Sequence, residues 1–182
     1  GVGGAIIAGT DYRNVNSRGR PDAASDIYCQ RINSAGEQMW TKNGVSVCAG
    51  INYQDYPELS SDGDRGAVIV WEDYRNDRGQ EAYFDTDIYA ARIDAHGELQ
   101  WAENGTTICT VTNSQCGPRL ITDKSGSAVF AWSDERSGYS NIYCGRRSGY
   151  GEALWGRDGT ALAGINSEQK RPALAGDGTP DG

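Results

Sequence analysis

The sequence contains few of the residues that most often carry enzymatic chemistry or membrane insertion. It has one histidine, one methionine and two phenylalanines in 182 residues. Its apolar runs, such as AVIVW at 67–71, are far shorter than the roughly 18 residues that a membrane-spanning helix needs. The single histidine, His96, falls in a predicted tight turn, so no Ser-His-Asp set can be assembled. We therefore expect a protein that is not an enzyme and does not insert into membranes.

Cysteine usage excludes a scaffold built on disulfides. The five cysteines are odd in number and none forms a C-x-x-C pair, which gives a zinc or redox site little support. Cys109 and Cys116 lie close enough in the chain to close a local disulfide, and we keep that pair as a candidate.

Positive charge is also in short supply. The chain has 17 Lys and Arg against 25 Asp and Glu, a formal net charge of -8. Nucleic acid binding depends on cationic side chains that displace phosphate counterions, so nucleic acid is excluded as a partner. The chain opens on Gly1 and its only methionine is Met39, which predicts a processed product or part of a longer polypeptide.

Internal repetition is the strongest positive signal. Three stretches match closely, DIYCQRINSAGEQMW (26–40), DIYAARIDAHGELQW (87–101) and NIYCGRRSGYGEALW (141–155). A second set also aligns, AIIAGTDYRN (5–14), AVIVWEDYRN (67–76) and AVFAWSDERS (128–137). A third set begins with glutamine, QDYPELSSD (54–62), QCGPRLITD (115–123) and QKRPALAGD (169–177). The chain therefore reads as one unit of three repeats, approximately 1–62, 63–123 and 124–182.

Each repeat predicts four short extended segments. They are a strand containing proline, an apolar strand ending in Trp-x-Asp, the Asp-Ile-Tyr strand, and a strand ending in tryptophan. Residues 67–71 are apolar at successive positions, which is typical of a strand covered on both faces. Glycines such as Gly97 supply tight reversals between segments. An all-β fold follows, with three four-stranded antiparallel repeats that form β-propeller blades.

The Trp-x-Asp-x-Arg, Asp-Ile-Tyr-x-x-Arg and Gly-x-x-x-Trp patterns resemble β-propeller repeats of large secreted and surface proteins of bacteria. The resemblance spans essentially the whole chain and implies an extracellular or cell-surface location. It implies little about function, because propellers host many functions. We expect a non-catalytic structural or protein-interaction module. The alternatives are a glycan-binding, lectin-like propeller and an accessory domain of a carbohydrate-active enzyme.

Two departures from the repeat affect assembly. Gly9 stands where the other copies have Trp71 and Trp132, so the first blade lacks a large apolar anchor. The repeat also begins at its second segment, so the C-terminal strand is able to complete the first blade or a neighbouring one. Because propeller rings contain about four to eight blades, a ring or fibre would be completed by other copies or by further repeats.

Charged residues that recur in every repeat predict structural ion pairs. Half-buried charges must be paired, and a strut near the strand ends explains the recurrence better than a sugar clamp does. The recurring residues are Asp11, Asp73 and Asp134, Arg13, Arg75 and Arg136, and Arg31, Arg92 and Arg146.

Differences between the repeats point to a candidate binding surface. The loop between the second and third segments changes length, spanning 14–25, 76–86 and 137–140 in the three copies. Such variable loops gather on one face of a repeat array, and aromatic side chains beside polar ones suit sugar rings. Packing of these loops on one another is the competing interpretation. The candidate ligand-binding residues are Arg18, Arg20, Tyr53, Tyr56, Tyr83, Phe84, Asp85 and Tyr139.

No cofactor is required by any motif, and Ca²⁺ is the one ion with a candidate site. The stretches SDGDRG (61–66) and GDGTPDG (176–182) space aspartates and glycines as some calcium loops do, although neither supplies the usual alternating run. Turn formation explains both stretches equally well. The candidate ligands are Asp62, Asp64, Asp177 and Asp181.

Overall fold

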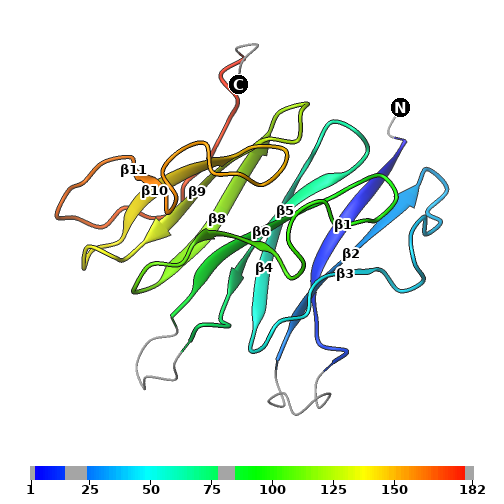
Figure 1. The fold of residues 1–182 in the computed structure, drawn as a ribbon, viewed down its shortest axis with the longest axis horizontal. Coiled ribbons are helices and arrows are strands. Elements are labelled where there is room, and N and C mark those ends of the chain that lie inside the picture. The colour runs from blue at the N-terminus through cyan, green and yellow to red at the C-terminus, as the bar shows by residue number, and fades with distance from the viewer. Residues whose placement is uncertain (1–2, 15–23, 78–84, 179–182) are drawn as a thin grey trace.

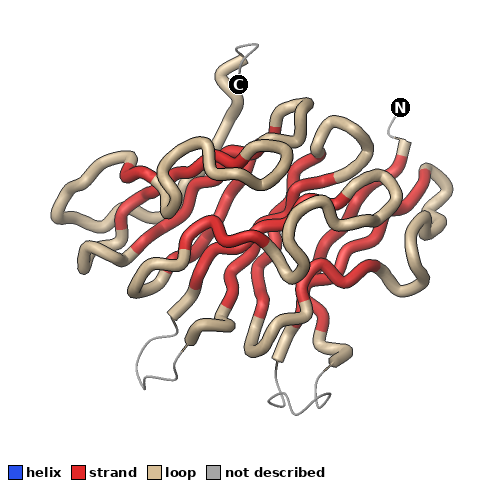
Figure 2. Tube along the Cα trace, in the orientation of Figure 1, coloured by secondary structure: helices blue, strands red, loops and turns tan. Residues whose placement is uncertain are grey.

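The computed structural model describes residues 3–14, 24–77 and 85–178. These residues form three antiparallel sheets and contain no helix (Figure 2), so the all-β prediction is confirmed. In the described part of the chain no helix is long and apolar enough to cross a membrane.

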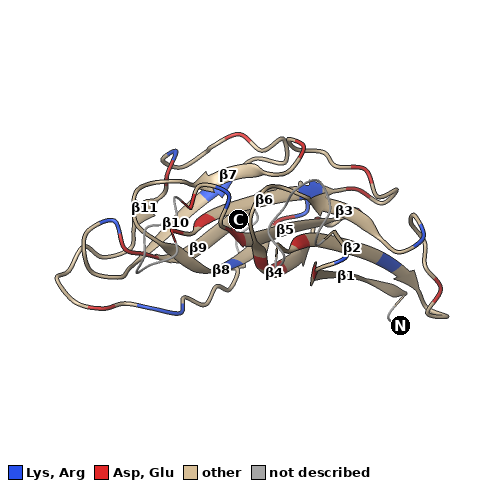
Figure 3. Ribbon diagram, turned by 90° about the horizontal axis from the view of Figure 1, so that it is seen from below, with Lys and Arg blue, Asp and Glu red and all other residues tan. Residues whose placement is uncertain are grey.

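The sheets follow one another in chain order and lie side by side (Figure 1). The first sheet contains β1 (Gly4–Asp11), β2 (Asp26–Asn33) and β3 (Val45–Cys48). The second contains β4 (Gln54–Ser61), β5 (Ala67–Asp73), β6 (Asp87–Ile93) and β7 (Thr106–Cys109). The third contains β8 (Gln115–Thr122), β9 (Ala128–Asp134), β10 (Asn141–Arg147) and β11 (Thr160–Ala161). In the view turned by 90°, β1, β4 and β8 lie along one edge of the molecule (Figure 3).

Two apolar cores join the three sheets face to face. Because side chains alternate along a strand, β5 contributes to both cores. Ile69 and Trp71 pack into the core shared with the first sheet, whereas Val68 and Val70 pack into the core shared with the third sheet. Every residue of β5 is buried. The continuous apolar run at 67–71 therefore does mark a strand covered on both faces.

The prediction of a fourth strand ending in tryptophan is wrong. That segment contributes only one isolated bridge in each sheet, such as Ile93 with Leu99, and the fourth strand follows the tryptophan instead. The reason is that the indole turns toward the neighbouring sheet. The chain then reverses at residues with positive φ, Asn104 (59°) and Gly105 (94°), before β7 pairs with β6.

The prediction of a strand at 169–177 is also wrong, since these residues are extended without strand pairing. Their contacts still resemble those of β4 and β8. The amide of Gln169 donates to the Ser140 carbonyl at 2.6 Å, as Gln115 donates to Thr86 at 2.7 Å. The segment therefore occupies the position of a first strand, but no second strand among the described residues pairs with it.

Candidate functional site

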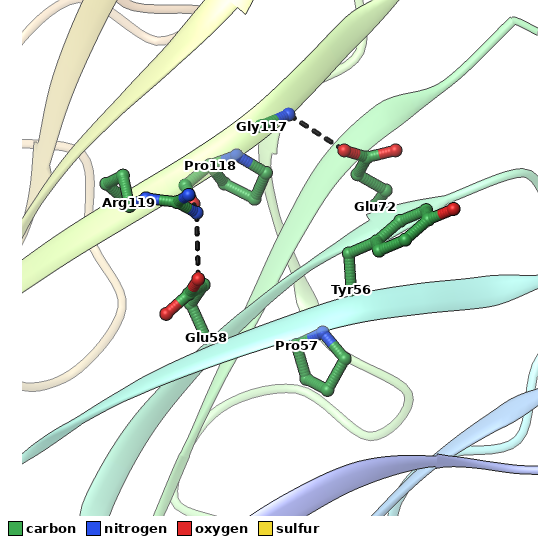
Figure 4. A pocket seen from close by; sticks show the side chains of 7 residues that line it. All are labelled: Tyr56, Pro57, Glu58, Glu72, Gly117, Pro118 and Arg119. Atoms are coloured by element: carbon green, nitrogen blue, oxygen red, sulfur yellow. Dashed lines mark hydrogen bonds and ion pairs between the residues drawn. The ribbon is translucent and has the colours of Figure 1, made fainter. Parts of the chain in front are cut away.

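A pocket of about 350 Å³ opens between β4 and β8, and we call it the Glu72 pocket (Figure 4). β4 supplies one wall, β8 supplies the other, and Glu72 of β5 lies between them. The lining residues are Tyr56, Pro57, Glu58, Glu72, Gly117, Pro118 and Arg119.

Glu72 is the most deeply buried charged group of this pocket, with 8% of its surface exposed. The amide of Gly117 donates to its Oε1 at 2.8 Å. Burial raises the pKa of the Glu72 carboxyl above its usual range, the Gly117 amide lowers that pKa in part, and the nearby charge of Asp55 raises it. The pocket thus presents a partly desolvated carboxyl that can accept or donate a hydrogen bond.

The mouth of the pocket carries an ion pair. Arg119 Nη1 lies 2.8 Å from Glu58 Oε1, and both side chains are 47% exposed. An exposed pair of this kind contributes little to stability, about 1 kcal/mol or less. Arg119 and Glu58 can therefore give up their contact with each other and bind a polar ligand instead.

Tyr56 stands beside this ion pair with 67% of its surface exposed and with a φ of 54°. The positive φ coincides with a register shift between β4 and β5, and Gly117 has a φ of 61° at the matching shift in β8. Residues other than glycine adopt this conformation at a cost of about 1 kcal/mol. The bulge turns the tyrosine ring outward at the pocket.

Glu72 and Arg119 occur together only at the boundary between the second and third sheets among the described residues. The positions that correspond to Glu72 in the other two repeats hold Thr10 and Ser133, and the position of Arg119 holds Ala173 in the C-terminal segment. Residues that differ between copies are not required to build the sheet. Sequence reasoning missed Glu72, Glu58 and Arg119, although comparing the three copies position by position would have singled them out.

Of the four predicted ligand-binding residues that the structure describes, one lies in this pocket. Tyr56 lines it, whereas Tyr53 packs edge-on against Tyr74 with ring centroids 6.0 Å apart. Asp85 is half-buried just before β6, and Tyr139 is 45% exposed in the turn after β9. The other four predicted residues lie outside the described residues: Arg18, Arg20, Tyr83 and Phe84.

The oxygens of Asp62, the first predicted calcium ligand, already have protein partners. Its Oδ1 accepts hydrogen bonds from the amides of Asp64 and Gly66, and its Oδ2 lies 3.0 Å from Arg92 Nη2. This arrangement is that of a capped turn joined to an ion pair. Asp64 and Asp177 are exposed and Asp181 lies outside the described residues. Within the described ranges no group of three or more His, Cys, Asp or Glu residues is placed to hold a metal ion.

The predicted disulfide is not formed, because Cys109 and Cys116 are both free thiols. Cys109 ends β7 and its Sγ accepts a hydrogen bond from Arg136 at 3.1 Å. Cys116 lies on β8 and pairs in register with Ser133. The two side chains thus belong to different sheets, which nearness in sequence did not reveal.

The predicted ion pairing of the repeated charges is confirmed for most copies. Arg75 Nη2 lies 2.5 Å from Asp73 Oδ2, and the guanidinium stacks over the Tyr89 ring at 4.0 Å. The first and third repeats contain the same arrangement. Arg92 and Arg146 pair with Asp62 and Asp123, at the ends of β4 and β8. These groups hold strands together and are not available as sugar clamps.

The repeated tryptophans join one sheet to the next. Trp40 lies over Gly97, where an added Cβ would be 2.9 Å from the indole, and its Nε1 donates to the Ala95 carbonyl at 3.0 Å. Trp101 donates in the same way to the Gly149 carbonyl at 2.9 Å. The glycine therefore provides the flat surface that the indole needs.

Trp155 is the third member of this series and remains 42% exposed. Among the described residues no sheet follows the third one, so nothing takes the part of Gly97. At the other end of the array Gly36 also has a positive φ, 81°, and no described atom lies within 4 Å of an added Cβ. The exposed indole at one end and the uncovered glycine at the other are thus the two halves of one kind of contact.

Searches against protein-family models, curated proteins and solved structures found no match for this chain.

Proposed function

We propose that this chain is a non-catalytic protein-interaction module, built of β-propeller blades, that assembles with further copies of itself or with further repeats of the same pattern. The exposed Trp155 is the observation that carries this proposal. Trp40 and Trp101 are buried because each packs on the next sheet, and Trp155 offers the same indole to solvent.

Burial of one further tryptophan is a substantial driving force for assembly. Fully burying a large apolar side chain contributes about 2 to 3 kcal/mol, and a contact of this kind is a common anchor of protein interfaces. Other exposed apolar side chains lie in the segments before and after β11: Leu154, Leu162 and Ile165.

The face of the first sheet that lies opposite its core is suited to receive such a partner. Alternate residues of β1 are exposed on this face, namely Ala5, Ile7 and Gly9. The corresponding residues of β5 pack against the preceding sheet, namely Ala67, Ile69 and Trp71. Gly9 leaves this face flatter than its equivalents. We propose an extracellular or cell-surface setting on the resemblance of the repeats to those of secreted bacterial propellers.

The test is sedimentation velocity of the purified chain over a wide range of concentration, with Trp155→Ala beside it. We expect the parent to associate and Trp155→Ala to weaken association by at least tenfold, with little change in the unfolding free energy. Tyr150→Ala is the matched control, because Tyr150 is 87% exposed at the tip of a turn. A parent chain that stays a 19.6 kDa monomer at every concentration would refute self-assembly.

The Glu72 pocket supports a second candidate function, binding of a small polyhydroxylated ligand such as a glycan. An exposed aromatic ring beside a buried carboxyl and an arginine is a common way to hold sugar hydroxyls. A glycan array with the parent, Tyr56→Ala and Glu72→Gln tests it. Specific binding that both substitutions weaken is the expected result, and no binding by the parent excludes a lectin.

A further inference from the structure

β1 is a sheet edge where the other two sheets have an additional strand. β5 and β9, its counterparts, pair with β4 and β8 on that side. β1 pairs only with β2 among the described residues. Within the described part of the chain, the first sheet therefore has one strand position open.

A cavity of about 680 Å³ lies along this open edge. It is bounded by β1, by the end of β4 and by the turn that follows it, and Arg31 contributes to its lining. The corresponding cavity of the third sheet measures about 340 Å³, and residues 121–123 at the end of β8 form part of its lining. The larger space is where a first strand of the first sheet would end.

Such a strand would supply the ion-pair partner of Arg31. In the second and third sheets, the matching arginines pair with an aspartate at the end of the first strand, Arg92 with Asp62 at 3.0 Å and Arg146 with Asp123 at 3.4 Å. Arg31 donates to the Ala95 carbonyl at 3.0 Å, but no described carboxylate forms an ion pair with it. The open position thus calls for a strand that ends in an acidic residue.

Residues 169–178 resemble a first strand in sequence and in contacts, although they have no strand pairing. The Gln169 amide donates a hydrogen bond to the backbone of the preceding sheet, as the amides of Gln54 and Gln115 do. Arg171 has a φ of 61° at the position of the bulge, and its amide donates to Ser133 Oγ at 3.3 Å, as Gly117 donates to Glu72. Asp177 and Gly178 occupy the sequence positions of Asp62 and Gly63.

We propose that residues 169–178 of one copy pair antiparallel with β1 of a second copy and become the first strand of that copy's first sheet. This inference rests on the proposed self-assembly and names the surface that carries it. A second copy is the fitting partner because the second sheet lies between 169–178 and β1 within one chain (Figure 1). The carboxylate at position 177 of one copy then lies at Arg31 of the other.

The internal repeats define the register of this pairing. Glu58 pairs with Val70 and Arg119 with Ala131, so Ala173 will pair with Ala8. Leu59 pairs with Ile69 and Leu120 with Phe130, so Leu174 will pair with Ile7. Directly opposed residues of antiparallel strands have Cα atoms about 4.5 to 5.5 Å apart, a separation that a disulfide can bridge.

The experiment is disulfide trapping between two differently tagged chains, in a background that carries Cys116→Ser and Cys144→Ser. Chains with Ala8→Cys and with Ala173→Cys are mixed under mild oxidation. The pair Ile7→Cys and Leu174→Cys provides a second test at exposed or half-exposed positions. The control mixes Ile7→Cys with Ala173→Cys, whose side chains would point to opposite faces.

We expect both matched pairs to form at least tenfold more linked heterodimer than the control. Arg31→Glu and Asp177→Arg provide an independent measurement, since each alone should weaken association and an equal mixture of the two should restore it. Association without linkage at either matched pair overturns this inference and leaves the proposed function standing. A parent that does not associate at all overturns both this inference and the proposed self-assembly.

Discussion

Trp71 Nε1 donates a hydrogen bond to Asp73 Oδ2 at 2.8 Å, two residues further along the same buried strand. The same carboxylate accepts hydrogen bonds from the Arg75 guanidinium, so Asp73 is the partner of an indole and a guanidinium at once. Trp132 and Asp134 repeat this relationship in the third sheet at 2.8 Å. The first sheet keeps the aspartate and arginine but has Gly9 in place of the tryptophan.

Asp73→Asn should lower the unfolding free energy by about 3 kcal/mol, because it leaves the half-buried Arg75 without its carboxylate. Asp11→Asn is the matched control and should cost about 1 kcal/mol or less, since its pair with Arg13 is partly exposed. Urea unfolding of the three proteins measures both values. Equal losses at the two positions would show that burial does not set the strength of these pairs.

Trp71→Gly, which installs the residue of the first repeat, should cost about 3 to 5 kcal/mol because it opens a cavity between two sheets. The reverse change, Gly9→Trp, meets no atom within 4 Å of its Cβ and should leave the fold intact. Thermal unfolding compares the two substitutions. A large loss from Gly9→Trp would mean that the outer face of β1 is already covered.

Asp87→Asn should remove a pH dependence of stability. Burial raises the pKa of the Asp87 carboxyl to about 6, so the folded state binds a proton that the unfolded state has already released. This group therefore lowers the unfolding free energy as the pH rises from about 4 to about 6, by about 3 kcal/mol in total. The loss should be absent in Asp87→Asn.

The third repeat supplies the control for this titration, because Asn141 occupies the position of Asp87. Asn141→Asp should introduce a similar loss of stability toward neutral pH. Unfolding curves at several pH values test both changes, and identical curves for the parent and Asp87→Asn would contradict the raised pKa.

All five cysteines should be alkylated after unfolding, since each is a free thiol. In the folded protein Cys116 and Cys144 should react first because both are partly exposed, whereas burial raises the pKa of Cys29 and Cys109 to about 12. Mass spectrometry of the labelled chain counts and locates the reactive thiols. Two thiols that stay unlabelled after unfolding without a reductant would indicate a disulfide.

Much of the fold was predictable from local patterns. The apolar run at 67–71 and the glycines of the tight turns are local features, and they identified the strands and reversals correctly. The fourth strand was misplaced because the tryptophan that appeared to end it serves the neighbouring sheet. No local pattern reports which sheet a side chain will contact.

The candidate site was predicted less well for the same reason. Tyr56 was identified by its residue type, but Glu72 directly follows the apolar run of β5 and accepts a hydrogen bond from Gly117 of the neighbouring sheet. Cys109 and Cys116 are neighbours in sequence that the fold assigns to different sheets. Residue types suggested candidates, and only the packing of sheets selected among them.

The sequence by itself determined the three repeats, the all-β class and the pairing of the repeated aspartates with arginines, because these depend on strand periodicity and on charges that recur at fixed spacing. The tertiary structure alone decided which side chains are exposed at the two ends of the described array of sheets. Trp155 has the same local sequence context as Trp40 and Trp101, and it is exposed only because no described sheet follows it. Burial is a property of neighbours in space, and it is these neighbours that separate a structural tryptophan from one available to a partner.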